Sequence, residues 1–147
     1  VSYLEGSALY LYCAVKQLGS YRGFRVRIEA DGQAVREREM MMLIVANARV
    51  FGGGFKIAPQ ADPADGKLDA VAFDNMGLGG RVEAMVRLLL GNHAAHSKVE
   101  TFAAARLVCR FEEPPTYETD GEWNRARSAE LVIETRPRAL SVLVPAP

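Results

Sequence analysis

The sequence has few of the residues and segments that would place it outside the ordinary globular classes. Its 147 residues include two cysteines, one tryptophan and two histidines, and 18 basic residues balance 18 acidic ones. A formal net charge of zero removes the overall field that draws basic proteins to DNA or to anionic membranes, so we expect no nucleic-acid partner. The longest apolar run, Met40 to Ala46, is far shorter than the ~20 residues of a membrane-spanning helix. We therefore expect a soluble domain that recognises its partners locally.

The two cysteines indicate the redox environment. Cys13 and Cys109 each lie among apolar neighbours and have no metal-ligand spacing between them. This usage is typical of two buried thiols in a reducing compartment and not of a structural disulfide. Since no signal peptide is visible either, we expect a cytoplasmic protein.

What the chain does have is enough apolar sequence, 49% of its residues, for one sizeable core. Apolar residues at helical spacing predict two helices, and alternating or continuous apolar segments predict strands. The expected helices are 4–18 and 79–90, and the expected extended segments are 24–28, 36–46, 68–73, 99–111, 131–134 and 140–144. The pattern predicts a mainly β fold with peripheral helices, in a sandwich or another layered architecture.

The first candidate for chemistry is the short run Asp120-Gly121-Glu122, in a polar stretch between extended segments. If this stretch is itself extended, the two carboxylates face the same side. Such a pair can hold a cation, or one acid can act as a general base while the other orients a nucleophile. Turn chemistry alone favours the simpler interpretation of a solvent-exposed turn.

The second candidate is the loop from Pro59 to Asp69. Asp62 and Asp65 can converge there, and Gly66 allows a backbone carbonyl to turn inward, which is the all-oxygen environment that Mg²⁺ and Ca²⁺ prefer. The spacing does not match an EF-hand loop, and an ordinary Asp-Gly turn is the simpler alternative on local chemistry.

Three further patterns carry less information. The glycines at 52–54 lack the Lys-Ser or Lys-Thr continuation of a phosphate-binding loop, so a bend is the simpler interpretation. His93 and His96 have no third metal ligand in register, and we expect both at the surface. Four arginines near the C-terminus could meet phosphates or lipid head groups, but solvated strand faces explain them equally well; they are Arg125, Arg127, Arg136 and Arg138.

The combination of these segments resembles the diacylglycerol kinase family. The resemblance is carried, in order, by Asn47-x-x-x-x-Gly52-Gly53-Gly54, by Ile57-Ala58-Pro59-x-Ala61-x-x-x-Asp65-Gly66-x-Leu68-Asp69, by Asp120-Gly121-Glu122, and by Pro137-x-Ala139-Leu140-x-Val142. It extends over almost the whole chain and is similar to the C-terminal domain of the bacterial soluble lipid kinases related to sphingosine and ceramide kinases. It implies a β-sandwich domain packed against a separate α/β nucleotide-binding domain, with the active site in the cleft between them.

The resemblance also implies roles for individual residues. Glu122 matches the family's acidic catalytic residue, and Asp120 beside it would help to position the acceptor hydroxyl. Asp62, Asp65 and the carbonyl of Lys67 match a structural Mg²⁺ site, although family members vary at the position of Asp62. ATP would be the co-substrate, and a diacylglycerol-like or sphingoid lipid alcohol the acceptor.

One feature of the family is not found in these residues, namely the Gly-Gly-Asp-Gly-Thr nucleotide motif of its N-terminal domain. We therefore expect residues 1–147 to be the C-terminal half of an enzyme, inactive alone, whose N-terminal kinase domain belongs to the same parent chain. Transient contact with a membrane surface is expected, and a homodimer is compatible with the resemblance. A non-catalytic binding module and a nicotinamide-nucleotide kinase relative are the alternatives.

Overall fold

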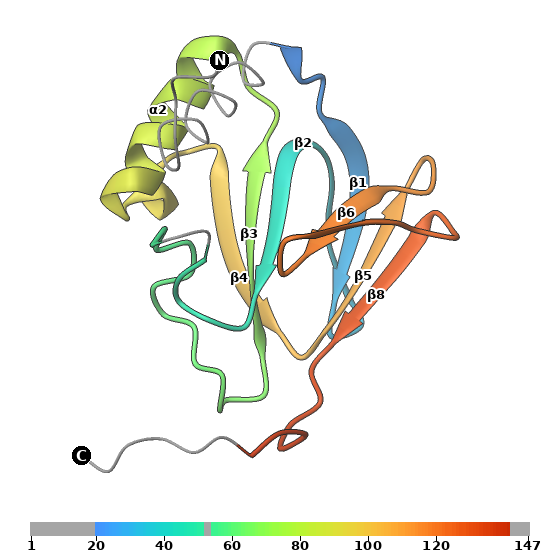
Figure 1. The fold of residues 1–147 in the computed structure, drawn as a ribbon. Coiled ribbons are helices and arrows are strands. Elements are labelled where there is room, and N and C mark those ends of the chain that lie inside the picture. Colours follow the sequence, from blue (N-terminus) through green and yellow to red (C-terminus); the bar gives the residue numbers. More distant parts are fainter. Residues whose placement is uncertain (1–19, 52–53, 142–147) are drawn as a thin grey trace, which may run out of the picture.

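The computed structural model describes residues 20–51 and 54–141, which form an antiparallel β structure with a helix against one side (Figure 1). The elements in chain order are β1 (Phe24–Ala30), β2 (Gln33–Ala46), β3 (Leu68–Asp74), α2 (Leu78–Leu90), the 3₁₀ helix η1 (His93–Ala95), β4 (Val99–Ala104), β5 (Arg106–Phe111), β6 (Thr116–Thr119), β7 (Glu122–Arg125) and β8 (Glu130–Glu134). Six strands form one sheet in the order β4-β3-β2-β1-β5-β8, while β6 and β7 pair only with each other. The predicted β-rich fold is confirmed.

The β1–β2 hairpin follows directly from the local sequence. Asp31 and Gly32 both have positive φ, 48° and 81°, which is the backbone of the tight turn that an Asp-Gly pair favours. Before the turn, Val26 and Ile28 are buried, whereas the intervening Arg27 is exposed. The long second strand lies at the centre of the sheet, between β1 and β3, as its continuous apolar run predicts.

All six strands of the main sheet contribute to one apolar cluster. It contains Val26, Ile28, Met40, Ala70, Ala72, Ala104, Leu107 and Cys109, and Phe102, Leu131 and Ile133 pack against it. Phe102 belongs to the edge strand β4 and Ile133 to the opposite edge strand β8. Because side chains from both edges reach the same cluster, the sheet must curve strongly around it, which explains the sandwich-like shape.

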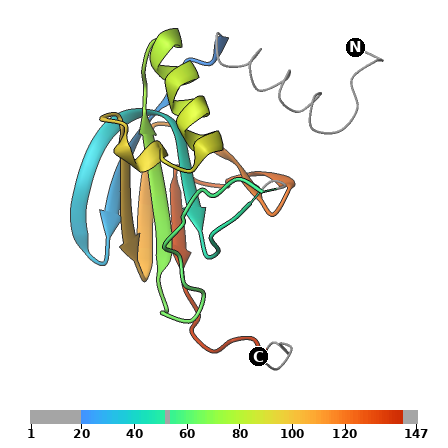
Figure 2. The same ribbon diagram turned by 90° about the vertical axis from the view of Figure 1, so that its left-hand side faces the viewer.

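A second apolar cluster lies on the other face of the sheet. Val71, Phe73 and Val99 of the strands pack there against Ala84 and Leu88 of α2 and against the segment around Ile57. Arg49 fastens this segment to the end of β2 by donating from Nε to the carbonyl of Ala61 at 3.0 Å. The helix therefore covers one face of the sheet at one end (Figure 2).

Both histidines belong to this second layer, so the expectation of surface histidines was wrong. His93 is 1% exposed and stacks on Phe73, with ring centroids 6.0 Å apart, and His96 is also buried. The physical reason is that α2 ends at Gly91, which has φ 73°, and the chain then turns inward through η1. A histidine in this position fills space beneath the helix end.

The other expected helices and strands are partly confirmed by the structure. The helix expected at 79–90 is confirmed, and none of the helices in the described part of the chain is long and apolar enough to cross a membrane. The extended run expected at 99–111 is two strands, β4 and β5, separated at Ala105. The helix expected at 4–18 lies outside the described residues, as does most of the strand expected at 140–144; Leu140 and Ser141 are described and are not in a strand.

Candidate functional site

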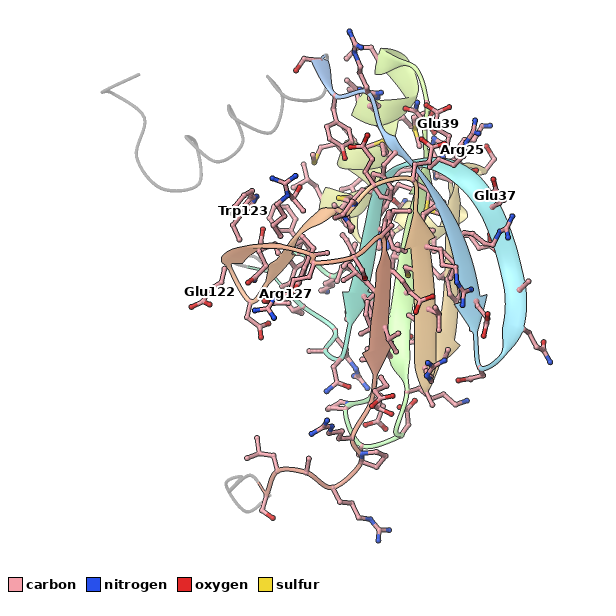
Figure 3. The ribbon with its side chains drawn as sticks, turned by 90° about the vertical axis from the view of Figure 1, so that its right-hand side faces the viewer. Arg25, Glu37, Glu39, Glu122, Trp123 and Arg127 are labelled. Atoms are coloured by element: carbon pink, nitrogen blue, oxygen red, sulfur yellow. The ribbon has the colours of Figure 1, made fainter. Side chains whose placement is uncertain are left out.

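The candidate catalytic residues lie at the tip of the β6–β7 hairpin, which projects away from the main sheet (Figure 3). Asp120 and Gly121 form its two-residue turn with φ values of 50° and 92°, and Glu122 is the first residue of β7. An Asp-Gly pair can adopt this doubly left-handed backbone at low cost. Both carboxylates are exposed to solvent.

The turn changes the expected relationship between the two acids. The alternation of an extended strand would have placed both carboxylates on one side, but Asp120 is in the turn and not in a strand. Glu122 instead pairs with Thr119, and Glu118 pairs with Trp123. Glu122 and Trp123 therefore lie on opposite faces of the hairpin, as Figure 3 shows.

The face that carries Glu122 is polar. It also holds Tyr117, Thr119 and Asn124, because paired residues share a face and alternate along each strand. Asn124 donates from Nδ2 to Thr119 Oγ1 at 3.1 Å and to the carbonyl of Glu122 at 3.0 Å. The side chain of Asn124 thus ties the backbone of Glu122 to the opposite strand, and leaves the carboxylate free to meet a ligand.

The candidate metal loop forms a series of turns that the aspartates stabilise. Asp62 Oδ1 accepts from the backbone N–H of Ala64 at 2.9 Å, and Asp65 Oδ1 accepts from that of Lys67 at 2.8 Å. These are Asx turns, in which one oxygen of each carboxylate accepts a backbone hydrogen bond two residues further on. The carbonyl of Gly66 accepts from Thr135 Oγ1 at 2.8 Å, which attaches the loop to the chain after β8.

The donors of this loop fit a hard cation in chemistry, since they are carboxylate and carbonyl oxygens. Within residues 20–51 and 54–141, however, no cluster of three or more His, Cys, Asp or Glu side chains is placed to hold a metal ion. A Mg²⁺ ion held by Asp62, Asp65 and the carbonyl of Lys67 would therefore keep several of its waters, as Mg²⁺ usually does.

The structure does not bring the two candidate sites together. The metal loop lies at the end of the sheet where β3 begins, and the β6–β7 hairpin extends from a different part of the molecule (Figure 1). An ion at Asp62 and Asp65 would act on the loop and on Thr135, not on the tip of the hairpin that carries Glu122.

Two polar sites were not anticipated from the sequence. One is an open cleft of about 540 Å³ beside the start of α2, lined among others by Arg38, Asp74, Asn75 and Arg81. Arg38 bridges Asp74 and Glu100, and its pKa is raised because these hydrogen bonds and charges outweigh the loss of solvation. The only signal in the sequence was an arginine at position 81, on the same helical face as the buried Ala84 and Leu88.

The other is a smaller cavity of about 180 Å³ between η1 and the sheet, lined among others by Asp69, His93 and Thr101. His93 donates from Nε2 to the carbonyl of Ile57 at 2.8 Å, and its Nδ1 has no partner among the described residues. Loss of solvation, with a contribution from the charge of Asp65, raises the pKa of Asp69 although Lys67 opposes the shift. No sequence pattern indicated this arrangement, because its three side chains come from different elements.

The curved antiparallel sheet, with a separate two-stranded hairpin outside it, defines a β-sandwich-like domain. Comparison with known families places it more exactly, because residues 1–144 match the model of the YegS C-terminal NAD kinase beta sandwich-like domain. The chain belongs to this family.

Individual relatives agree with this placement. The diacylglycerol kinase of Bacillus subtilis (strain 168) is 26% identical over 127 residues, which cover 86% of this chain and 42% of that protein. A crystal structure of a diacylglycerol kinase from Bacillus anthracis strain Sterne matches with a TM-score of 0.64 and 20% identity, covering 92% of this chain and 48% of that one. A second crystal structure from that organism has a TM-score of 0.65 and 21% identity, covering 95% and 50%. At these identities the structures establish the fold, and the chain spans half or less of the length of these relatives.

Proposed function

We propose that this chain is the C-terminal part of an ATP-dependent lipid kinase that transfers the γ-phosphate to a lipid hydroxyl. The observation that carries the proposal is the exposed Asp120-Gly121-Glu122 turn, held at the tip of a separate hairpin in a domain whose relatives include diacylglycerol kinases. The ATP would be bound mainly by an N-terminal domain of the same parent chain. The acceptor would be a diacylglycerol-like or sphingoid alcohol taken from a membrane surface.

Glu122 is the proposed general base. Phosphoryl transfer depends mainly on positioning and on neutralising charge, and an alcohol acceptor also needs a group that takes its proton. A carboxylate can do this when it lies about 2.6–3.2 Å from the hydroxyl. In the described residues Glu122 faces solvent, so a second domain must cover the hairpin to exclude water and bring the reactants together. Asp120, which lies two residues before Glu122 in the turn, would help to orient the acceptor.

The proposed Mg²⁺ at Asp62, Asp65 and the Lys67 carbonyl has a structural role in this scheme. Its charge would neutralise the two carboxylates and hold the turns of the loop, whose Gly66 carbonyl already contacts Thr135. Such an ion would be separate from any metal that accompanies ATP in the transfer.

The test uses the full-length parent protein with Glu122→Gln, which keeps the size and hydrogen-bonding capacity of the side chain but removes its basicity. We expect kcat for lipid phosphorylation to fall at least about a hundredfold, with little change in the melting temperature. Glu118→Gln is the matched control, because Glu118 lies on the opposite face of the same hairpin, and it should leave kcat unchanged. A Glu122→Gln protein as fast as wild type would remove the base assignment.

The same assay separates the alternative functions. NAD replaces the lipid in a second series, and phosphorylation of NAD without phosphorylation of lipid would indicate a nicotinamide-nucleotide kinase. A parent protein that binds lipid vesicles but transfers phosphate to neither acceptor would indicate a binding module.

A further inference from the structure

Thr135, the residue that follows β8, joins the end of the main sheet to the candidate metal loop. Its Oγ1 donates to the carbonyl of Gly66 at 2.8 Å and lies farther, at 3.5 Å, from the carbonyl of Ala105. Its backbone N–H donates to that same Ala105 carbonyl at 3.0 Å, which fixes Thr135 at the junction of β4 and β5. Figure 3 shows the segment after β8 running beside the loop that precedes β3. Thr135 therefore connects three segments that are distant in sequence.

The hydrogen bond from Thr135 acts on a peptide group that also holds a proposed metal ligand. The carbonyl of Gly66 and the N–H of Lys67 belong to one planar peptide group. That N–H donates to Asp65 Oδ1 at 2.8 Å. Because the group is planar, its carbonyl cannot turn without turning the N–H as well. The hydroxyl of Thr135 thus fixes the direction in which the N–H meets the carboxylate of Asp65.

The position of this peptide group in the loop explains why it needs such support. It follows Gly66, whose φ of 74° lies in the left-handed region and whose backbone is intrinsically flexible. The next residues lead into β3, where Leu68 pairs with Ala104. The segment that carries Thr135 also packs on the glycine, since a Cβ at Gly66 would lie 3.5 Å from Cγ of Pro137. The side chain of Thr135 therefore holds the loop at its most flexible point.

We propose that Thr135 is a positioning residue for the proposed Mg²⁺ site of this loop. Two of the three proposed ligands depend on the peptide group that it holds: Asp65 through its hydrogen bond, and Lys67 because its own N–H belongs to that group. A ligand set that is already ordered before binding loses less conformational freedom when the ion arrives, and so binds it more tightly. The proposal rests on the Mg²⁺ site of the proposed function, and not on the transfer of phosphate.

Calorimetric titration of Mg²⁺ into the full-length parent protein, freed of metal with EDTA and without nucleotide, tests this role. Thr135→Val keeps the branched shape of the side chain but removes the donor, and we expect the Kd for Mg²⁺ to rise about tenfold. Thr135→Ser retains the hydroxyl and should stay within about twofold of wild type. Ser128→Ala is the matched control, because it removes a 2.8 Å hydroxyl-to-carbonyl bond near the start of β8, and it should leave Kd unchanged.

A contact that only stabilises the fold would give a different result. Thr135→Val would then lower the melting temperature of the metal-free protein and leave the Kd for Mg²⁺ as in wild type, which would overturn the proposal. An equally large rise in Kd for Thr135→Ser would overturn it too, since the effect would then belong to the methyl group and not to the hydroxyl.

Asp65→Ala in the same titration separates failure of the positioning role from failure of the metal site. If Asp65→Ala loses Mg²⁺ binding while Thr135→Val binds like wild type, only the role of Thr135 is overturned. If wild type binds no Mg²⁺, or if Asp65→Ala binds it equally well, the site itself is overturned and the role of Thr135 with it.

Discussion

Asn124 and Thr119 are joined across the β6–β7 hairpin by a hydrogen bond of 3.1 Å from the amide Nδ2 to the hydroxyl Oγ1. The same Nδ2 donates to the carbonyl of Glu122. The backbone of the candidate base is therefore held both by its strand partner Thr119 and by the side chain of Asn124. In a hairpin with no sheet neighbour among the described residues, this side-chain link supplies rigidity that a neighbouring strand would otherwise give.

The first prediction follows from this link and from the proposed role of Glu122 as general base. Asn124→Ala removes both hydrogen bonds, so Glu122 should lose its fixed position while its carboxylate is kept. We expect kcat for lipid phosphorylation by the full-length protein to fall roughly ten- to a hundredfold, with a smaller change in KM. Thr119→Ser, which retains the Oγ, should remain close to wild type in the same steady-state assay, and an equal loss in this control would point to a general effect on the hairpin.

The second prediction concerns the metal loop. Mg²⁺ bound only by the folded protein raises its melting temperature, and Asp65→Ala should reduce this rise because it removes a proposed ligand. Lys67→Ala should preserve the rise, since the proposed ligand there is the backbone carbonyl. Thermal unfolding with and without Mg²⁺ measures both variants, and an undiminished rise in Asp65→Ala would place the ion elsewhere.

The third prediction concerns pH. Burial raises the pKa of the Cys109 thiol from 9.0 to about 11. The folded state thus holds this proton more tightly than the unfolded state, so the resulting stability is complete below about pH 9 and is lost as the pH rises toward 11. Urea unfolding from pH 8 to about pH 11 should show a steeper loss of stability in Cys109 protein than in Cys109→Ala, with Cys13→Ser in both. Parallel pH profiles would contradict the assignment.

The fourth prediction compares two ion pairs that differ in burial. The side chain of Arg38 is only 12% exposed and bridges Asp74 and Glu100, whereas Arg27 and Glu37 form a bridge of 2.7 Å in solvent. Removing Arg38 leaves two carboxylates close together in a partly buried place, so Arg38→Ala should lower the free energy of unfolding by about 1–3 kcal/mol. A double-mutant cycle on Arg38 and Asp74 should give a larger coupling energy than the cycle on Arg27 and Glu37. Equal coupling energies would show that burial does not matter here.

Much of the fold could be predicted because its signals are local. The Asp31-Gly32 turn and the helix that ends at Gly91 each depend on a few neighbouring residues. The break at Ala105 was not predictable in the same way. It depends on the path that carries the chain from the β4 edge of the sheet to the place of β5 beside β1, and this is set by contacts distant in sequence.

In the candidate site, too, some features follow from the local sequence and others depend on contacts between residues that are distant in sequence. The motif Asp120-Gly121-Glu122 could be recognised as a unit, and its turn conformation follows from the Asp-Gly pair. The support from Asn124, and the burial of His93 and Arg81, depend on cross-strand register and on packing under α2. Polar residues that are buried for such reasons look like surface residues in a sequence.

The connection between β5 and β8 has a consequence for how this domain could evolve. The two strands are hydrogen-bonded neighbours, and the excursion that holds β6 and β7 is closed at its base by a 2.8 Å bond from the N–H of Phe111 to the carbonyl of Ala129. The chain thus leaves the sheet at the end of β5 and re-enters it beside the same point at the start of β8. The hairpin can therefore be regarded as an insertion between two neighbouring strands. The sequence between β5 and β8 could therefore change, or be lost together with any chemistry at the hairpin tip, without disturbing the pairing of the six-stranded sheet.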